Sequence, residues 1–355
     1  MPMKQPFWGV GGLNLKYEYL LITNAALREQ EAQKLISMKR LFILLVTAIA
    51  CGAGVMAQEN WIATLQHGSD IQAFYGENAL SAAHEAAVDG DIITLSAGEF
   101  YGLNVTKAIT LRGESMERTL ITSRITFTLP EKSTHTLVLE GLKITYSWDD
   151  CVNIYGSDGT EKAIVSKCYI HVDGRNWALA FENCKGTVIQ SHVNGSIGAY
   201  TGSHVTCLNS IIRFLVCEGN GTFDVENCFL SDELCEQIHY STIKNSIFQN
   251  GFHELRTDNT NTFSHCLVAG TIPIPVSDFG WTLTDVWNPW DGIVGENYHL
   301  TEEAAATYIG TDGTQIGIYG GMYPYDLAPS YPLVKTLDVV GSHKNGKLNV
   351  KINVK

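Results

Sequence analysis

Acidic, basic and aromatic side chains that could do chemistry gather in two short stretches of the chain. Carboxylic acids, His and Arg can move protons during a reaction, and indole rings can stack on flat ligands such as sugar rings. The candidate residues are Asp149, Asp150, Asn153, His171, Asp173, Arg175 and Trp177 in the first stretch, and His253, Glu254 and Arg256 in the second. The alternative for the second stretch is that Glu254 and Arg256 form an ordinary ion pair on a solvated surface.

A short pattern that recurs six times between residues 165 and 268 must position these side chains. Its first and sixth columns are apolar, its third column is polar and its fourth column is small. The copies follow one another at similar but unequal intervals, which is typical of a solenoid whose repeats bury their apolar faces against their neighbours. The copies are VSKCYI from Val165, VIQSHV from Val188, CLNSII from Cys207, VENCFL from Val225, IKNSIF from Ile243 and FSHCLV from Phe263.

The third column indicates the kind of solenoid. The first and sixth columns can both point inward only if the strand bends between them, and Asn tolerates the left-handed conformation that such a bend needs. Asn209, Asn227 and Asn245 could also bond to one another along the axis. Short β-branched and aromatic runs exclude leucine-rich and helical repeats, and the unequal spacing excludes a left-handed hexapeptide helix. The sequence therefore predicts an all-β fold, a right-handed parallel β-helix.

Residues 78–115 predict how the solenoid begins. Asn78 is suited to capping a short helix that covers the open end of the strand stack, and strands are expected at 92–95 and 108–111. The buried face of this helix would carry Leu80, Ala83, Ala87 and Val88. The stretch resembles the start of pectin-lyase-like right-handed β-helix proteins, where a capping helix leads into GD-x-I-x-L-x-x-G-x-(F/Y) and an apolar-x-L-x-G strand. The resemblance implies this fold over roughly residues 70–320, and the fold alone specifies no activity.

One motif in the first stretch is similar to a catalytic strand. Asp149-Asp150-Cys151-Val152-Asn153-Ile154 resembles the D-D-C-(I/V)-x-I strand of polygalacturonases, whose acids protonate the leaving oxygen and activate water. The resemblance implies catalytic roles for Asp149 and Asp150, with His171 at the place of the family's Gly-His-Gly. Thr128 stands where the family has a further Asp, and His171 lacks flanking glycines. The alternative is that the two aspartates form a turn before a strand.

The remaining candidates are similar to residues in the sites of β-helix lyases. Those enzymes hold calcium against a uronate carboxylate with acids, while an Arg, Lys or His abstracts the adjacent proton. The resemblance implies a catalytic Arg256, with calcium as cofactor only if the chain is a lyase. Otherwise the sequence indicates no cofactor, and the lack of a CxxC pair argues against a structural metal. The substrate-binding candidates are Asn153, Asp173, Arg175, Trp177, His253 and Glu254.

Residues 38–57 predict export. MKRLFILLVTAIACGAGVMAQ from Met38 has two basic residues, an apolar core and a small-residue cleavage site, as in a secretory signal peptide. Residues 1–37 would then be a wrongly assigned extension, and the mature chain would start at Gln58. Cys51 in AIAC offers an alternative lipoprotein site. No other apolar run is long enough to span a bilayer, so the expected location is the periplasm, the cell surface or the exterior.

Charge and cysteine content restrict the partners. Without residues 1–57 the chain carries 18 basic and 34 acidic residues, a net charge of −16, which disfavours nucleic acid as a partner. Cys168, Cys228 and Cys266 share the fourth column with serines, so they are expected to be small buried thiols. We expect a monomer with one continuous core.

The C-terminal part has its own pattern. ENYHLTEEAAATYIGTDGTQIGIYGG, residues 296–321, resembles the closing segment of many secreted bacterial β-helix proteins. Trp281, Trp287 and Trp290 precede it, and would plug the second end of the stack or form a carbohydrate platform. Residues 348–355 alternate apolar and polar, which predicts a strand. With the signal peptide, these features resemble β-helix proteins exported by gut-type Bacteroidetes, and predict a β-helix over 58–322 and a tail over 323–355.

These observations predict an exported β-helix that binds a polysaccharide or other glycan along one flank and, if it is an enzyme, cleaves it as a lyase or glycoside hydrolase. A parallel sheet along a solenoid offers the extended surface that a polymer needs. An enzyme would show clustered acids with shifted pKa values in a groove, whereas a binding protein would show exposed aromatic rings. The alternative is a structural or adhesive surface protein, which would show neither a groove nor such a cluster.

Overall fold

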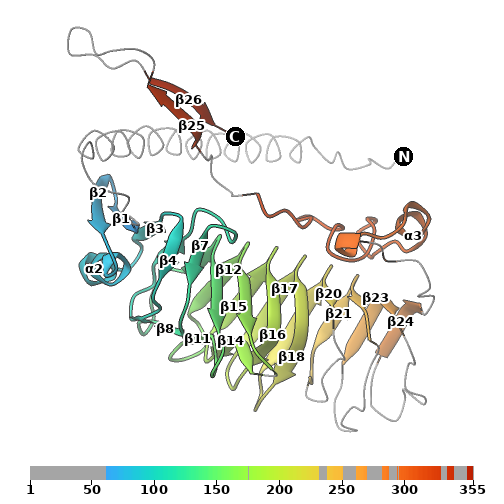
Figure 1. Cartoon of the computed structure of the whole chain (residues 1–355). Helices are drawn as coiled ribbons and strands as arrows, with labels where there is room; N and C mark the ends of the chain where they lie inside the picture. Colours follow the sequence, from blue (N-terminus) through green and yellow to red (C-terminus); the bar gives the residue numbers. More distant parts are fainter. Residues whose placement is uncertain are drawn as a thin grey trace, which may run out of the picture. The chain divides into compact units, whose positions relative to one another are not determined.

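The computed structural model describes residues 61–174, 176–231, 238–250, 261–269, 282–287, 294, 296–328, 334–339 and 350–354. All of them belong to one of two units, residues 59–355. They form a right-handed parallel β-helix, as the repeat predicts (Figure 1).

Three parallel sheets, here called A, B and C, run along the β-helix. Sheet A contains β3 (Ile92–Leu95), β6 (Thr110–Arg112), β9 (Leu137–Glu140), β12 (Lys162–Ser166), β15 (Lys185–Ile189), β17 (His204–Leu208), β19 (Thr222–Glu226), β21 (Thr242–Lys244), β23 (Thr262–Val268) and β24 (Thr282–Trp287). Sheet B contains β4 (Gly98–Phe100), β7 (Thr119–Ile121), β10 (Lys143–Tyr146), β13 (Tyr169–Val172), β16 (His192–Ala199), β18 (Ile211–Cys217), β20 (Phe229–Leu230) and β22 (Ile247–Phe248), and it continues into the second half of β23. Sheet C contains β5 (Asn104–Val105), β8 (Ile125–Thr128), β11 (Val152–Tyr155) and β14 (Trp177–Glu182), and it continues into the second halves of β16 and β18.

The six copies of the repeat stack in the predicted register. Their first-column residues pair in succession from Val165 through Val188, Cys207, Val225 and Ile243 to Phe263. Every third-column residue has a left-handed backbone, with φ from 45° to 54°, and these residues are Lys167, Gln190, Asn209, Asn227, Asn245 and His265. The bend between sheets A and B is therefore confirmed.

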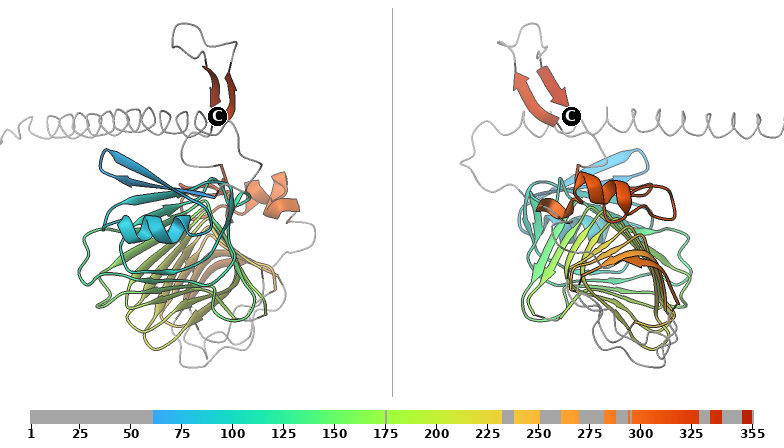
Figure 2. Two further views of the ribbon diagram at one scale, coloured as in Figure 1. Left: turned by 60° about the vertical axis from the view of Figure 1, so that its left-hand side comes forward. Right: turned by 90° about the vertical axis from the view of Figure 1, so that its right-hand side faces the viewer.

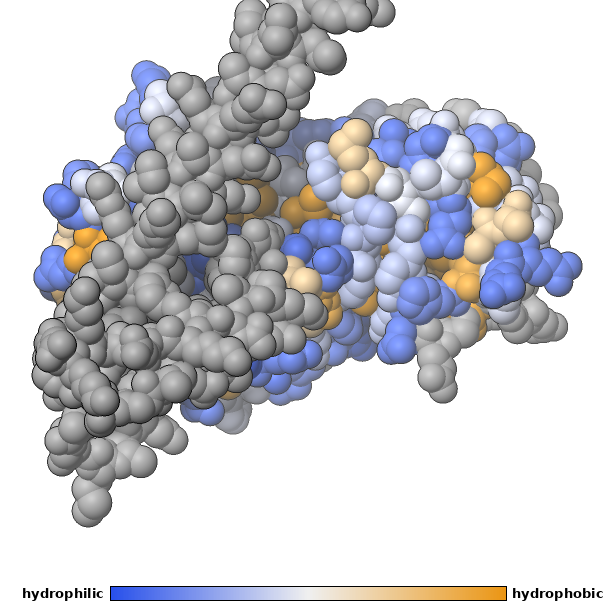
Figure 3. All heavy atoms as spheres, turned by 90° about the horizontal axis from the view of Figure 1, so that it is seen from above, coloured by the Kyte–Doolittle hydropathy of each residue, from blue (hydrophilic) through white to orange (hydrophobic). Residues whose placement is uncertain are grey.

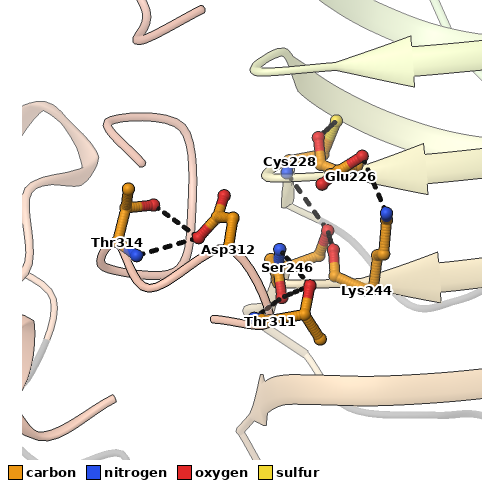
Figure 4. Close-up of polar contacts among 8 residues, drawn as sticks. Glu226, Cys228, Lys244, Ser246, Thr311, Asp312 and Thr314 are labelled. Carbon is orange, nitrogen blue, oxygen red and sulfur yellow. Dashed lines mark hydrogen bonds and ion pairs between the residues drawn. The ribbon is translucent and has the colours of Figure 1, made fainter. Parts of the chain in front are cut away.

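Hydrogen bonding explains why the fourth column is small. The Ser246 hydroxyl accepts the backbone N–H of Cys228 one coil earlier at 3.1 Å, and donates to the carbonyl of Lys244 at 2.8 Å (Figure 4). Ser191 and Ser210 bond in the same way. The cysteines of this column are buried free thiols, as predicted, and burial raises the pKa of Cys228 to about 12.

Replacing Cys228 by Ser should change the free energy of unfolding by less than about 1 kcal/mol, because the serine hydroxyl already serves in this column. Replacing Cys228 by Leu should cost about 1–3 kcal/mol by overpacking. Chemical denaturation of the two variants would measure both values. Equal losses for Ser and Leu would contradict the hydrogen-bonding account.

A helix and a hairpin cover the N-terminal end of the stack (Figure 2). Helix α2 (Ala79–Ala86) contacts β1 (Ile62–His67), β2 (Asp70–Tyr75) and β3. Two details of the prediction were wrong. The side chain of Asn78 makes no capping hydrogen bond. Val88 lies beyond the end of the helix and is 49% exposed, because the chain already turns into extended backbone at Ala87.

The C-terminal segment packs against the bend between sheets A and B. It contains η2 (Glu296–Tyr298) and α3 (Glu302–Thr307), whose N-terminus is capped by the Thr301 hydroxyl. Residues 308–328 then follow the third column. Two of the column's asparagines bond to this segment rather than to one another: Asn209 donates to the carbonyls of Ile318 and Gly320, and Asn245 bonds Thr311. The buried amide nitrogen of Asn227, between them, has no hydrogen-bond partner among the described residues.

The predicted terminal strand is present as β26 (Val350–Val354), which pairs antiparallel with β25 (Val334–Val339). Trp287 packs on His265 and Tyr308. Trp281 and Trp290 lie outside the described residues.

Candidate functional site

The outer face of sheet C brings together acidic and aromatic side chains from successive coils. We call this set the sheet C patch, and its members are Arg124, Asp149, Asp150, Asn153, Tyr155, Trp177, Glu182, Tyr200 and Glu218. Tyr155 and Glu182 are register partners. Tyr200 and Glu218 follow Ala199 and Cys217, which continue the same ladder. The patch therefore spans several coils although its members come from distant parts of the sequence.

Asp149 and Asp150 share one cation in the turn before β11. The Arg124 guanidinium lies 3.3 Å from a carboxylate oxygen of each aspartate. The Asp149 side chain is 59% exposed and that of Asp150 is 25% exposed. Burial, and then the negative charge of Asp149, raise the pKa of Asp150, whereas Arg124 and hydrogen bonds from Asn153 and the Trp177 backbone lower it without cancelling the rise. The raised pKa favours the protonated form of Asp150, which can donate its proton.

Replacing Asp150 by Asn should make the protein slightly more stable at neutral pH. In the unfolded chain Asp150 titrates near its ordinary pKa of 3.8, and the pKa is higher in the folded chain. The folded state therefore binds the proton more tightly, and stability falls as pH rises through that window. The gain from Asn should stay below about 1 kcal/mol, because the side chain keeps solvent contact, and should vanish in acid. Urea denaturation at several pH values would measure it, and a gain independent of pH would contradict the assignment.

Two aromatic rings lie over a small-residue row of sheet C. Trp177 and Tyr200 have ring centroids 5.2 Å apart. Beneath them lies Gly198, where an added Cβ would meet both rings at 2.9–3.0 Å. Ala180 and Gly198 continue the register of Asn153. Small side chains in this row let the two rings pack close to the sheet, which leaves aromatic faces beside the carboxylates.

The patch is strongly acidic. Four of its members are carboxylic acids and one is an Arg. Burial and the neighbouring carboxylate of Glu182 raise the pKa of Tyr155, and burial and the charge of Glu218 raise the pKa of Tyr200. Both tyrosines therefore keep their hydroxyl proton at neutral pH and can donate hydrogen bonds to a ligand. Trp148, in the turn beside Asp149, is 86% exposed.

His171 lies on sheet B and is not brought to the aspartates. Its Nε2 is 3.3 Å from a carboxylate oxygen of Asp173, and its ring stacks with Tyr169. The reason is the length of this coil. The partner of Val152 one coil later is Leu179, which lies well beyond His171 in the sequence. The chain at His171 has therefore not yet reached sheet C.

The other sequence candidates divide in two groups. Asp150, Asn153 and Trp177 come together in the sheet C patch, and Thr128 lies beside Tyr155 in the register of β8 and β11. Arg175, His253, Glu254 and Arg256 lie outside the described residues.

Within the part of the chain that the structure describes, no group of His, Cys, Asp and Glu could hold a metal ion, and no helix has the length and apolarity to cross a membrane.

The sequence alone does not single out five residues of this surface, Arg124, Glu182, Gly198, Tyr200 and Glu218. Their spacing from the repeat is not constant, since Glu182 follows Cys168 at a greater distance along the chain than Tyr200 follows Ser191. Tyr155, Glu182, Tyr200 and Glu218 alternate tyrosine with glutamate from one coil to the next along sheet C. This pattern is visible only after the strand pairing is known.

Comparison with known proteins finds likeness in solved structures. A PL6 family alginate lyase, AlyGC, shares 13% identity over 59% of this chain and 39% of that chain, with a TM-score of 0.29. A pectin methylesterase from Aspergillus niger shares 12% identity over 65% of this chain and 87% of that chain, with a TM-score of 0.31. No family model and no curated protein matches the chain. The strand pairing itself shows a right-handed parallel β-helix, the fold that the repeat predicts.

Proposed function

We propose that this protein binds a glycan across the sheet C patch. The observation that carries the proposal is the placement of Trp177 and Tyr200 beside the carboxylates of Asp149 and Asp150 on the outside of neighbouring coils, where the buried Asn153 holds Asp150 by a hydrogen bond. Aromatic faces stack on the apolar side of sugar rings, while carboxylates and tyrosine hydroxyls form hydrogen bonds with sugar hydroxyl groups. The ladder of sheet C offers this combination along several coils, as a linear polymer requires.

The charge of the patch indicates the ligand class. Four carboxylates face one Arg, so a polymer of uronic acids would meet repulsion unless cations screen it. A neutral glycan meets no such penalty. We therefore favour a neutral polysaccharide. In the same proposal the chain is exported by residues 38–57 and works from Gln58 onward, where a polysaccharide outside the cell is accessible.

Binding should be tested with the mature chain against a panel of neutral and uronate polysaccharides, in affinity electrophoresis and calorimetry. Saturable binding of a neutral polymer is the expected result. Binding of uronates alone, strengthened by calcium, would instead support the lyase resemblance. Failure of every polymer would leave the structural or adhesive alternative.

Cleavage is a second candidate function, favoured by the raised pKa of Asp150 beside Asp149. Such a pair suits an acid that protonates a leaving oxygen. Release of reducing ends without ultraviolet-absorbing unsaturated products is expected if Asp150 acts in hydrolysis, and Asp150→Asn should then abolish release while keeping binding. Unsaturated products would indicate a lyase instead.

A further inference from the structure

The outer edge of sheet C carries tyrosine and glutamate in alternate coils. Tyr155 and Glu182 end β11 and β14 and are register partners. Tyr200 and Glu218 follow the last residues of β16 and β18, and the backbone N–H of each donates at 2.9 Å to a carbonyl of sheet C one coil earlier. These four residues, here called the Tyr–Glu row, therefore follow the neighbouring strands β11, β14, β16 and β18 along the solenoid, with one member in each coil (Figure 1).

The spacing of the Tyr–Glu row suits one class of polymer. Neighbouring parallel strands lie about 4.8 Å apart, so each residue type of the row recurs at about 10 Å. An extended chain of β-1,4-linked hexopyranose sugars advances by nearly one strand spacing per sugar, and each sugar is turned over relative to the one before it. Such a chain would place one sugar on each coil and would repeat, like the row, after two.

The chemistry of the row alternates with the same period. Burial and then nearby carboxylates raise the pKa of Tyr155 and of Tyr200, so both hydroxyls can donate hydrogen bonds. The carboxylates of Glu182 and Glu218 only accept, and each can bind two hydroxyl groups at once. Along one edge of an extended β-1,4 chain, the vicinal diol of one sugar alternates with the hydroxymethyl group of the next. The row can therefore bind the diols with its glutamates and the hydroxymethyl oxygens with its tyrosines.

Two aromatic rings at the row suit the faces of the same chain. Trp177 packs on Tyr200 with ring centroids 5.2 Å apart. In a β-1,4-linked chain of gluco-configured sugars the hydroxyl groups lie around the edge of each ring, and C–H groups cover its two faces. Such faces stack on aromatic rings, so hydrogen bonding at the edge and stacking on the face can act on one chain together.

The face that carries the C-terminal segment offers no comparable row among the described residues. Figure 3 shows this face, where hydrophobic residues appear as separate spots among hydrophilic ones. Phe229 and Ile247, which point outward on sheet B, are buried in a cluster with Ile316 and Ile318 of that segment. On sheet C, by contrast, Tyr155 is exposed. A polymer thus finds a repeating set of accessible side chains on sheet C.

We propose that the glycan bound by this protein is a neutral polymer of β-1,4-linked, gluco-configured sugars, which lies along the solenoid axis with one sugar per coil on the Tyr–Glu row. Glu182 and Glu218 then bind the diols of alternate sugars, and Tyr155 and Tyr200 bind the hydroxymethyl oxygens between them. This inference rests on the proposed function of the sheet C patch, to which it adds the linkage of the polymer and its direction.

Calorimetry of the mature chain with three hexasaccharides of glucose tests the linkage. Cellohexaose, which is β-1,4-linked and extended, should bind at least about tenfold more tightly than α-1,4-linked maltohexaose or β-1,3-linked laminarihexaose, whose chains curve away from a straight row. Equal or tighter binding of either curved chain would overturn the inference and leave the glycan site in place. Failure of all three while another polysaccharide binds would do the same, whereas failure of every polysaccharide would overturn the proposed function itself.

Substitutions in the row test how the chain is held. Glu182→Gln and Glu218→Gln each replace an acceptor-only group by an amide, and each should weaken cellohexaose binding by at least about fivefold. Glu226→Gln is the matched control, because Glu226 lies on sheet A and pairs with Lys244 at 3.1 Å, so affinity should not change. Equal weakening by all three variants would trace the effect to net charge and overturn the assignment. Unchanged affinity of both row variants, with thermal unfolding showing an intact fold, would overturn it as well.

Discussion

Replacing Asn209 by Val is expected to lower the free energy of unfolding by about 2–4 kcal/mol. Asn209 has φ 45°, a conformation that costs a side-chain-bearing residue about 1–2 kcal/mol and a β-branched residue more. Its buried amide also donates to the carbonyls of Ile318 and Gly320, and each lost bond of this kind costs about 0.5–1.5 kcal/mol. Denaturant titration of the mature chain would measure the loss.

Two variants separate the contributions. Asn209→Gly accepts the left-handed backbone but loses the bonds to Ile318 and Gly320, so it should cost about 1–2 kcal/mol. Thr206→Val, at an outward and half-buried position of β17, the strand that ends just before Asn209, should change stability by less than about 0.5 kcal/mol. Equal losses for Val and Gly at position 209 would show that backbone strain has no part in the effect.

Replacing Trp177 by Ala is expected to weaken glycan binding by at least about tenfold, or roughly 1.4 kcal/mol. Trp177 supplies the largest ring of the sheet C patch and packs on Tyr200 over Gly198. Aromatic anchors of this kind carry much of the energy at binding surfaces. Calorimetry with the polysaccharide found by screening would give the ratio of dissociation constants.

Lys143→Ala is the matched control for the Trp177 variant. Lys143 lies on sheet B over the ring of Tyr169, outside the sheet C patch, so its loss should leave affinity unchanged. Thermal unfolding of both variants would show whether the fold is preserved. An unchanged affinity for Trp177→Ala with an intact fold would move the site away from sheet C.

The fold was predictable because its repeat has a direct physical cause. The bend between sheets A and B needs a left-handed residue followed by a small one, and both requirements recur at nearly constant spacing. Lys167 and His265 adopt the same conformation as the asparagines, which shows that the position in the coil imposes the backbone and Asn merely suits it. The place where the C-terminal segment packs was not predictable, because the carbonyls that Asn209 and Gln190 bind lie far away along the chain.

The candidate site was predicted only in part because the corner between sheets B and C varies. Residues 173–176 separate β13 from β14, whereas β16 and β18 pass the corner as continuous strands. Counting residues onward from the repeat therefore no longer gives a residue's place in the strand register once the chain has passed sheet B. Asp150, Asn153 and Trp177 were predicted as candidates because all three lie close to the corner between sheets B and C, within one or two coils of each other. His171 was placed with them by a fixed spacing from the aspartates, which the longer coil does not have.

Hydroxyl-radical footprinting of the mature protein, with and without the bound polysaccharide, would test the location of the glycan site most directly. Aromatic side chains are reactive probes, and the described chain carries them on both sheets. The proposed site predicts protection of Tyr155, Trp177 and Tyr200 on sheet C, with Tyr169 and His192 on sheet B unchanged. Protection confined to Tyr169 and His192 would contradict it.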